Sequence, residues 1–180
     1  MYVHPAVRTA DLQILLSMLP EQAEPLRAET LAEIAARLAA GAPQWAATGV
    51  QTGRRGLRLL VSHQIEARLV AWETGRTTPA HDHGGAPAAW AVADGELVED
   101  QFDAPVWLSG PRRRRVAAAA AATLPPGQVH VLANPGPRRA LSVHVVAPPR
   151  RARLRPARAA AMLAEAVPWH ALAATAVSAP

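Results

Sequence analysis

The sequence contains no cysteine and no lysine, and it has only one tyrosine and one phenylalanine among its 180 residues. Without cysteine the chain can form no disulfide and can offer no thiolate to a metal ion. No apolar run approaches the roughly 20 residues that a membrane-spanning helix needs. The first residues lack the charged and then apolar order of a secretory signal. These absences predict a soluble cytoplasmic protein with neither a disulfide framework nor a membrane segment.

The charge of the chain is positive, at a formal net +5, and all 19 of its basic residues are arginines. The arginines accompany an abundance of alanine, proline and glycine, a joint bias that GC-rich coding produces without any partner. The two basic clusters, 111–115 and 148–158, are not interleaved with the aromatic side chains that stack on bases. We therefore predict no nucleic-acid partner and interpret both clusters as solvated basic surface.

Hydrophobic periodicity changes along the chain. Residues 9–19 and 28–42 carry apolar side chains at helical spacing, which predicts two amphipathic helices, the second ending at Gly41. From about residue 57 short apolar or alternating runs take over, divided by glycine and proline turns. These runs are 57–62, 67–73, 88–94, 96–102, 129–134 and 140–147. Such closely spaced short strands are typical of an antiparallel sandwich or barrel.

This pattern predicts three parts. An N-terminal helical segment, residues 1–48, is expected to pack on a β barrel formed by residues 49–150. Residues 151–180 are expected to hold a helix at 157–166 and a loose tail. Inside the barrel, the alanine run 117–122 has no periodicity of its own, and we assign it to a strand because a turn follows it.

Three of the seven histidines lie in extended segments beside tight turns. Side chains at positions i and i+2 of an extended chain point to one side, so His81 and His83 can hold one object together. Asp82 is left to accept a hydrogen bond from a backbone amide or to orient a ligand imidazole. His130 follows a proline-glycine turn on another extended segment. Three neutral imidazoles suit a divalent first-row metal such as Fe, Mn, Ni, Cu or Zn.

These stretches resemble the two sequence motifs of the cupin superfamily. The first motif, a glycine, five residues, His-x-His and a later glycine, is matched by Gly75, His81, His83 and Gly95. The second motif, Pro-x-Gly, two residues, His, three residues and Asn, is matched by Pro125, Gly127, His130 and Asn134. The resemblance implies a mainly β fold, a cupin or jelly-roll barrel with flanking N-terminal helices. Most metal cupins carry a glutamate soon after the second histidine, where this chain has Pro87 and Ala88.

The missing carboxylate points to one branch of the cupins. The stretches "VAWETGRTTPAHDHGG", "GELVED" and "SVHVVAPP" together resemble the cysteine dioxygenase family of thiol dioxygenases, over roughly residues 50–150. In that family three histidines bind ferrous iron without a carboxylate, so the resemblance implies Fe(II) on His81, His83 and His130. It also implies a small thiol and O2 as partners and a sulfinic acid as product. The alternative is a packed or solvated histidine trio on a cupin that has lost its metal.

The resemblance further assigns a residue to the substrate carboxylate. Family members use an arginine on the strand that precedes the His-x-His motif, and a guanidinium fork matches a carboxylate well. Arg55 and Arg58 compete for this role. We prefer Arg58, because it stands before two leucines much as the family's arginine does. Either arginine can instead be a surface residue.

On the last strand the family pattern is serine, histidine and tyrosine, hydrogen-bonded beside the iron. Ser142 and His144 match and are assigned catalytic roles, whereas Val146 stands where the tyrosine belongs. The sole tyrosine is Tyr2, and Ala88 occupies the place of the cysteine that some relatives crosslink to the tyrosine. Losing a positioned donor costs about 10²–10⁴-fold in rate. Val146 therefore indicates a slow enzyme or a substrate that supplies the missing group, and His144 can alternatively have a packing role.

The sequence as a whole predicts an iron thiol dioxygenase that oxidises a small carboxylated thiol of the cysteine or 3-mercaptopropionate type. Two other functions stay open: an iron cupin adapted to another substrate, and a non-catalytic cupin that binds a small molecule. The oligomeric state stays open as well. Trp72 and Trp90 are expected in the core, and Glu96 and Glu99 are expected to be exposed on the strand after the glycine turn.

Overall fold

The structure is a computed structural model and describes residues 1–20, 26–47, 56–102 and 110–149. Within these residues the chain forms two helices and nine strands. In chain order they are β1 (Tyr2–Val3), α1 (Thr9–Ser17), α2 (Ala28–Ala47), β2 (Leu57–Val61), β3 (Glu66–Trp72), β4 (Ala88–Asp94), β5 (Glu96–Phe102), β6 (Arg112–Ala117), β7 (Ala121–Leu124), β8 (Val129–Ala133) and β9 (Ala140–Val146). The helix expected at 157–166 lies outside the described residues.

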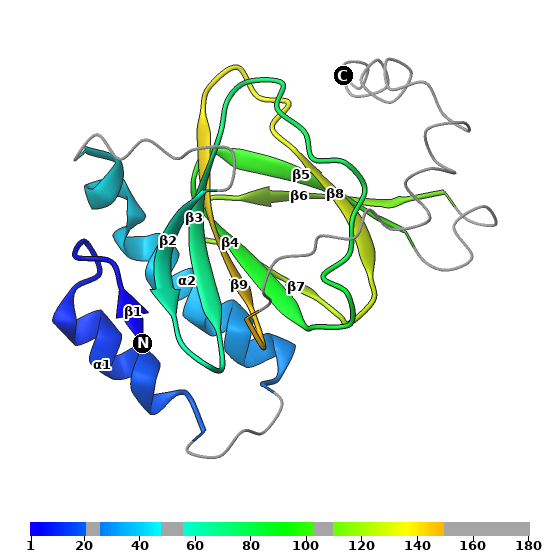
Figure 1. Ribbon diagram of the computed structural model, residues 1–180. Helices are drawn as coiled ribbons and strands as arrows, with labels where there is room; N and C mark the ends of the chain where they lie inside the picture. The colour runs from blue at the N-terminus through cyan, green and yellow to red at the C-terminus, as the bar shows by residue number, and fades with distance from the viewer. Residues whose placement is uncertain (21–25, 48–55, 103–109, 150–180) are drawn as a thin grey trace.

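The strands form two antiparallel sheets (Figure 1). The larger sheet has the strand order β1-β2-β3-β9-β4-β7, and the smaller sheet has the order β6-β5-β8. Helix α2 packs across the larger sheet, against β4, β9 and β7. This arrangement confirms the expected mainly β fold with N-terminal helices beside it. In the described part of the chain, no helix has both the length and the apolar content to cross a membrane.

The six strands predicted from short apolar runs are all present, each within one residue of its expected limits. They are β2, β3, β4, β5, β8 and β9. The turn between β4 and β5 depends on Gly95, whose φ is +78°. A Cβ atom there would lie 2.9 Å from the Cβ atom of Ala140. Glycine is therefore required both by the left-handed backbone and by the close approach of the neighbouring strand.

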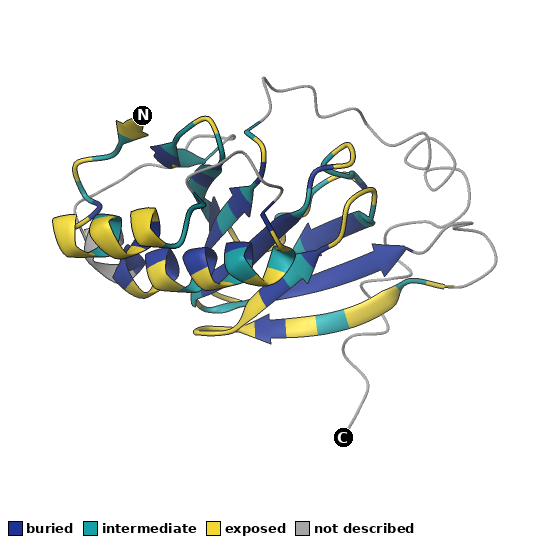
Figure 2. Cartoon of the chain, turned by 90° about the horizontal axis from the view of Figure 1, so that it is seen from below, coloured by how far each residue is buried: buried dark blue, intermediate teal, exposed yellow. Residues whose placement is uncertain are grey.

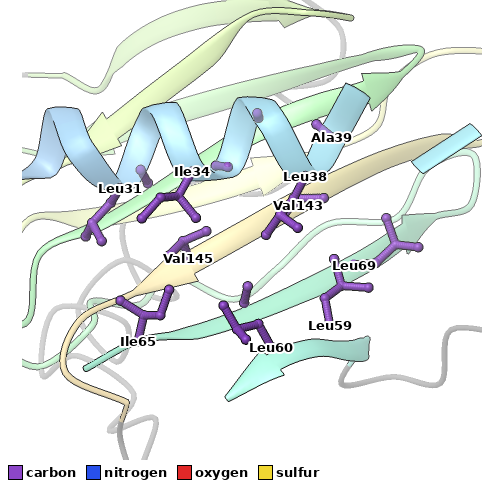
Figure 3. Packing of buried hydrophobic residues seen from close by; sticks show 14 of the residues in the cluster. Leu31, Ile34, Leu38, Ala39, Leu59, Leu60, Ile65, Leu69, Val143 and Val145 are labelled. Carbon is purple, nitrogen blue, oxygen red and sulfur yellow. The ribbon is translucent and has the colours of Figure 1, made fainter. Parts of the chain in front are cut away.

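The main core lies between α2 and the larger sheet. Leu31, Ile34 and Leu38 form one stripe of the helix, and each is at most 1% exposed. They lie over Val143 and Val145 of β9, which are fully buried (Figure 3). Burying each such side chain stabilises the fold by about 1.5–3 kcal/mol. The outward faces of α1 and α2 are exposed (Figure 2), as an amphipathic pattern predicts.

The orientation of β9 follows from this core. Successive strand side chains alternate between faces, so burying Val143 and Val145 under α2 turns Ser142, His144 and Val146 to the opposite face. Ser142 is fully buried there, whereas His144 and Val146 are half-buried. One face of the last strand thus builds the core, and the other presents a serine and a histidine away from the helix.

The sequence predicts that the second helix ends at Gly41, but the helix continues to Ala47. Ala39 and Ala42 are 3% and 0% exposed, and both belong to the core that α2 forms with the larger sheet. A glycine inside a helix costs about 1 kcal/mol relative to alanine. Packing on both sides of the glycine outweighs that cost, so the helix passes through it.

The alanine run 117–122 is not a single strand. Ala117 ends β6 in the smaller sheet, and Ala121 begins β7 in the larger one. The turn between them contains Ala119, whose φ is +69°. Uniform alanine has neither hydrophobic periodicity nor turn residues, so the sequence carried no signal for a turn at this position.

Most of the basic cluster at 111–115 forms strand β6, and Arg112, Arg113 and Arg115 are exposed on it, in agreement with the expected solvated basic surface. This strand pairs with the acidic strand β5. The guanidinium of Arg113 lies 2.7 Å from a carboxylate oxygen of Asp100, and that of Arg115 lies 2.8 Å from one of Glu96. Much of the positive charge of this cluster is therefore compensated across the strand pair.

Candidate metal centre

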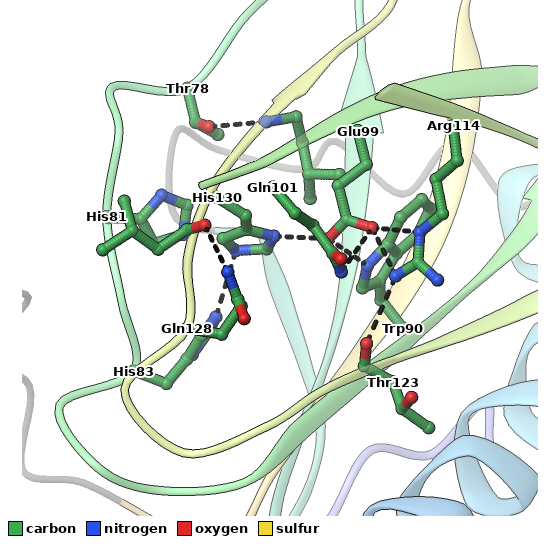
Figure 4. A network of polar contacts seen from close by, with 12 residues as sticks. Thr78, His81, His83, Trp90, Glu99, Gln101, Arg114, Thr123, Gln128 and His130 are labelled. Atoms are coloured by element: carbon green, nitrogen blue, oxygen red, sulfur yellow. Dashed lines mark hydrogen bonds and ion pairs between the residues drawn. The ribbon is translucent and has the colours of Figure 1, made fainter. Parts of the chain in front are cut away.

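Three imidazoles converge beside the smaller sheet. His81 and His83 come from the loop between β3 and β4, and His130 comes from β8 (Figure 4). One ring nitrogen of each lies within 4.8 Å of the corresponding nitrogens of the other two. The Nε2 atoms of His83 and His130 are 3.4 Å apart. The loop is held in place by two backbone hydrogen bonds, in which the amides of His81 and His130 donate to each other's carbonyl at 3.0 and 2.9 Å.

The hydrogen-bond partners of Nδ1 in two of the rings determine which ring nitrogen carries the proton. Nδ1 of His81 lies 2.9 Å from the carbonyl oxygen of Pro79, which can only accept a hydrogen bond. Nδ1 of His130 lies 2.7 Å from a carboxylate oxygen of Glu99. Both Nδ1 atoms therefore carry the proton, and both Nε2 atoms keep a lone pair. A cation between the rings would satisfy these facing lone pairs, so the residues present fit a divalent metal ion.

The electrostatics favour neutral rings at this centre. Burial, with a further contribution from neighbouring His130, lowers the pKa of His81 to about 4. A metal ion binds only the neutral imidazole, so a ring with a lowered pKa meets less competition from protons. His81 can thus act as a ligand without first releasing a proton at neutral pH.

Glu99 is not exposed, so the expectation from the sequence is wrong here. Its exposure is 0%, whereas the side chain of Glu96 on the same strand is 42% exposed. Burial by itself would raise the pKa of Glu99, but the hydrogen bond from Nδ1 of His130 and the ion pair with Arg114 outweigh it and hold the pKa below its usual value. The sequence did contain a signal, because Leu97 shares a face with Glu99 by the period of two and is fully buried.

A second cluster surrounds His144. Nε2 of His144 lies 2.8 Å from Oγ of Ser142, and the indole Nε1 of Trp72 donates to the same Oγ at 2.8 Å. The ring of Trp90 stacks on His144, with centroids 6.1 Å apart and planes 14° apart. Burial, with the nearby His83 adding to it, lowers the pKa of His144 well below its ordinary value. Because the imidazole is neutral, the hydroxyl of Ser142 can donate to it while accepting from Trp72.

Both tryptophans are core residues, as predicted, with exposures of 2% for Trp72 and 1% for Trp90. Their position gives them a further effect, because each indole ring packs beside His144 at a centroid distance of 6.1 Å. The two rings form apolar walls that hold the imidazole in one orientation.

Charged side chains continue the face of β9 that bears His144. Arg68 of β3 is in register with His144, and Glu66 is in register with Val146. Arg58 of β2 is in turn in register with Arg68. Residues directly opposite each other on neighbouring strands share a face, so these three charged residues lie on the same face as the histidine. Arg68 belongs to no motif, although alternation from Trp72 could have indicated its position on this face.

The two arginines differ in exposure. The side chain of Arg58 is 63% exposed, and its Nε lies 3.5 Å from Oε1 of Glu66. Arg68 is 24% exposed and donates from Nε to the same oxygen at 2.7 Å. Arg55, the other candidate from the sequence, lies outside the described residues.

The remaining motif residues hold the loops. Asp82 accepts a hydrogen bond from the amide of Gly84 at 2.9 Å, which is one of its two expected roles. The side-chain amide of Asn134 donates to the carbonyl of Trp72 at 2.9 Å and to that of Arg138 at 2.9 Å. The asparagine thereby joins the end of β3 to the turn after β8, which fixes the base of the loop that carries the first two histidines.

The two-sheet fold and the three converging histidines define a cupin whose centre can hold a metal ion. Residues 2–155 match the family described as cysteine dioxygenase type I, and the chain belongs to that family. No curated protein gives a significant match to the sequence.

Several solved structures are similar to the chain. A protein from Thermus thermophilus is 22% identical, with a TM-score of 0.46, over 55% of this chain and 90% of that one. A double-stranded β-helix protein from Klebsiella pneumoniae is 25% identical, with a TM-score of 0.45, over 55% and 83% of the two chains. A cupin superfamily protein from Desulfitobacterium hafniense is 15% identical, with a TM-score of 0.45, over 56% and 85%.

Proposed function

We propose that the protein is an iron-dependent thiol dioxygenase, which converts a small carboxylated thiol of the cysteine or 3-mercaptopropionate type into a sulfinic acid. The reaction adds both atoms of O2 to the sulfur, so that RSH and O2 give RSO2H. The observation that carries the proposal is the set of three converging imidazoles, which among the described residues includes no carboxylate, in a chain of the cysteine dioxygenase type I family. His81, His83 and His130 are the proposed ligands.

Ferrous iron on three neutral imidazoles would supply neighbouring positions for a thiolate and for O2 and would lower the pKa of the thiol. The chain's own contribution is to keep the inner nitrogens unprotonated. The carbonyl of Pro79 and the carboxylate of Glu99 each accept a hydrogen bond from the Nδ1–H group of a histidine, of His81 and His130 respectively. The Nε2 atoms of these two ligands therefore need not lose a proton before a metal ion binds.

Ser142 and His144 are proposed to act beside the sulfur and the oxygen. The hydroxyl of Ser142 bonds to Nε2 of His144 at 2.8 Å, which leaves the other ring nitrogen as a donor. Trp90 links this pair to the histidine centre, because its ring stacks on His144 and its indole N–H donates to Glu99. A neutral N–H donor in this place can stabilise negative charge that develops on oxygen.

The substrate carboxylate is proposed to bind on the charged face beside this pair. Arg58 is retained as the guanidinium that contacts the carboxylate, because its exposed side chain is accessible to a ligand. Arg68, in register with His144 and paired with Glu66, is positioned to assist. A hydrogen bond to a charged group contributes about 1.5–3 kcal/mol, so each arginine can account for a substantial part of the affinity.

The test begins with anaerobic reconstitution with Fe(II), followed by oxygen-uptake measurements against a panel of thiols. With ¹⁸O2, both oxygen atoms of the sulfinic acid should carry the label. His83→Ala should abolish stoichiometric iron loading. Tight metal binding without oxygen uptake on any thiol would favour the non-catalytic cupin instead.

The carboxylate site is tested with a matched pair of substrates. Arg58→Ala should raise KM for 3-mercaptopropionate by about 10- to 100-fold. It should leave KM for cysteamine, a thiol without a carboxylate, nearly unchanged. If Arg68→Ala alone produces this selective effect, the carboxylate binds to Arg68 and the assignment of Arg58 is wrong.

A second candidate function keeps the metal and changes the substrate. Val146 is half-buried at the end of β9, opposite Glu66, and is much smaller than the tyrosine of the family pattern. A valine at this position would obstruct a bulky ligand beside His144 less than a tyrosine would. Activity on a larger substrate, with none on small thiols, would favour this candidate.

A further inference from the structure

The two carboxylate oxygens of Glu99 accept hydrogen bonds from different groups of partners (Figure 4). Oε1 lies 2.7 Å from Nδ1 of His130 and accepts a second hydrogen bond from the indole of Trp90 at 3.3 Å. Oε2 accepts hydrogen bonds from Nε of Arg114 at 2.5 Å and from the amide of Gln101 at 3.4 Å. Four donors therefore hold a fully buried carboxylate in a single orientation.

The bond to His130 has an electronic consequence. A charged acceptor on one ring nitrogen fixes the tautomer and makes the other nitrogen a stronger donor. Because the three proposed ligands are neutral imidazoles, they bring no charge of their own to balance a dication. A carboxylate one ring away from the ion is placed to compensate for that charge through His130.

Arg114 acts on the other side of the same carboxylate. Its guanidinium pairs with Oε2 and also donates to the carbonyl of Thr123 at 3.2 Å, which anchors it to β7. A positive charge there draws electron density away from the oxygen that faces the histidine. The arginine and the imidazole therefore compete for one carboxylate.

We propose that Glu99 is a positioning residue of the metal centre, which fixes the tautomer of His130 and strengthens its bond to the ion, and that Arg114 limits how much negative charge reaches the ring. The inference rests on the proposed three-histidine centre. It does not depend on which substrate the protein oxidises.

The neighbouring ion pair provides a matched control. Glu96 and Arg115 lie on the same two strands as Glu99 and Arg114 and are also joined by a carboxylate-guanidinium contact, at 2.8 Å. Their side chains are 42% and 58% exposed, and the odd and even positions of a strand face opposite sides. Replacing Glu96 by glutamine therefore removes a similar charge without touching His130.

The first experiment measures the tautomer of His130 in the metal-free protein by ¹⁵N NMR. The unsubstituted protein and Glu96→Gln should show the proton on Nδ1. In Glu99→Gln the amide can donate to Nδ1, so the proton should shift toward Nε2, the nitrogen proposed to bind the metal. An unchanged tautomer in folded Glu99→Gln would overturn the first half of the proposal. This result is independent of whether the protein has any dioxygenase activity.

The second experiment measures Co(II) affinity and the Fe(III)/Fe(II) reduction potential in the absence of thiol. Glu99→Gln should weaken Co(II) binding by about 10- to 100-fold and raise the potential, because a weaker donor disfavours Fe(III). Arg114→Gln should lower the potential, because the full charge of the carboxylate then reaches the ring. Glu96→Gln should change the affinity less than about twofold.

The two substitutions should shift the reduction potential in opposite directions, and this distinguishes electronic tuning of the metal centre from simple structural support. If the ion pair only braced the strands, both substitutions would loosen the centre and move the potential in the same direction, and that result would overturn the proposal. Should Glu99→Gln fail to fold, a lowered potential in Arg114→Gln would still support it, and an unchanged or raised potential would overturn it. Failure of the unsubstituted protein to bind Co(II) or iron would refute the metal centre itself.

Discussion

Removing the hydroxyl of Ser142 should destabilise the protein far more than the loss of one oxygen atom suggests. Ser142 is fully buried, and its Oγ is joined to the indole of Trp72 and to the ring of His144, each at 2.8 Å. In Ser142→Ala the indole N–H, on a side chain that is 2% exposed, loses its acceptor. An unsatisfied buried donor costs about 1–3 kcal/mol, and the lost bond to His144 adds about 1 kcal/mol.

The expected loss in the free energy of unfolding is therefore about 2–4 kcal/mol, which corresponds to roughly 5–15 °C in Tm for a domain of this size. Urea denaturation followed by circular dichroism measures it. Ser17→Ala is a suitable control, because the hydroxyl of Ser17 donates to the carbonyl of Ile14 at an exposed site. Its effect should stay within about 0.5 kcal/mol.

A double-mutant cycle identifies the source of the effect. In a Trp72→Phe background no indole donor is left unsatisfied, so Ser142→Ala should cost about 1–2 kcal/mol less than it does in the unsubstituted protein. Equal costs in the two backgrounds would refute the argument, because the bond between Trp72 and Ser142 would then make no energetic contribution. His144 is unchanged in both backgrounds, so its share of the cost cancels.

Three further predictions concern separate parts of the molecule. Val146→Tyr should raise kcat of a thiol dioxygenase by up to about 100-fold in oxygen-uptake assays, whereas Val146→Phe should not; a fall in activity with both would indicate a bulkier natural substrate. Ala119→Gly should raise the free energy of unfolding by about 0.5–1 kcal/mol in urea titrations, because φ there is +69°, while Ala118→Gly should not stabilise. In metal-free protein, the pKa of His81 is about 4 when folded against 6.5 ordinarily, so the unfolded chain binds more protons between these values. The contribution of His81 to the free energy of unfolding should therefore be fully present above about pH 6.5 and should fall by about 3 kcal/mol toward pH 4. Urea titrations across this pH range measure it, and a free energy of unfolding that does not change with pH would contradict the prediction.

The sequence was sufficient to predict the elements with strong periodicity. Alternating runs located β2 and β9, and the helical stripe of α2 identified the side chains that form the core. These predictions succeed because burial of one face repeats at the period of the element. The histidines were recognisable for a related reason, since an i, i+2 spacing in an extended segment projects both rings to one side.

Other features depend on which strands pair with one another, and the sequence does not specify this pairing. Glu99 stands in the acidic run of β5, where Glu96 and Asp100 are charged as well, so charge alone does not reveal which carboxylate points inward, and only the alternation with Leu97 indicates it. The inward position is defined by pairing with β6 and β8, which places Arg114 and Leu132 opposite Glu99. The arginines of β6 were likewise interpretable only when their partner strand was known.

The backbone pairing of His81 with His130 has a consequence for how the centre binds ions. The two residues exchange amide-to-carbonyl hydrogen bonds, so the spacing between two of the three proposed ligands is fixed by main-chain geometry. An ion entering this centre would find the loop already ordered, and little conformational entropy would be lost on binding. Ions of different radius would then be accommodated mainly by the ring of His83, which makes that residue the adjustable member of the set.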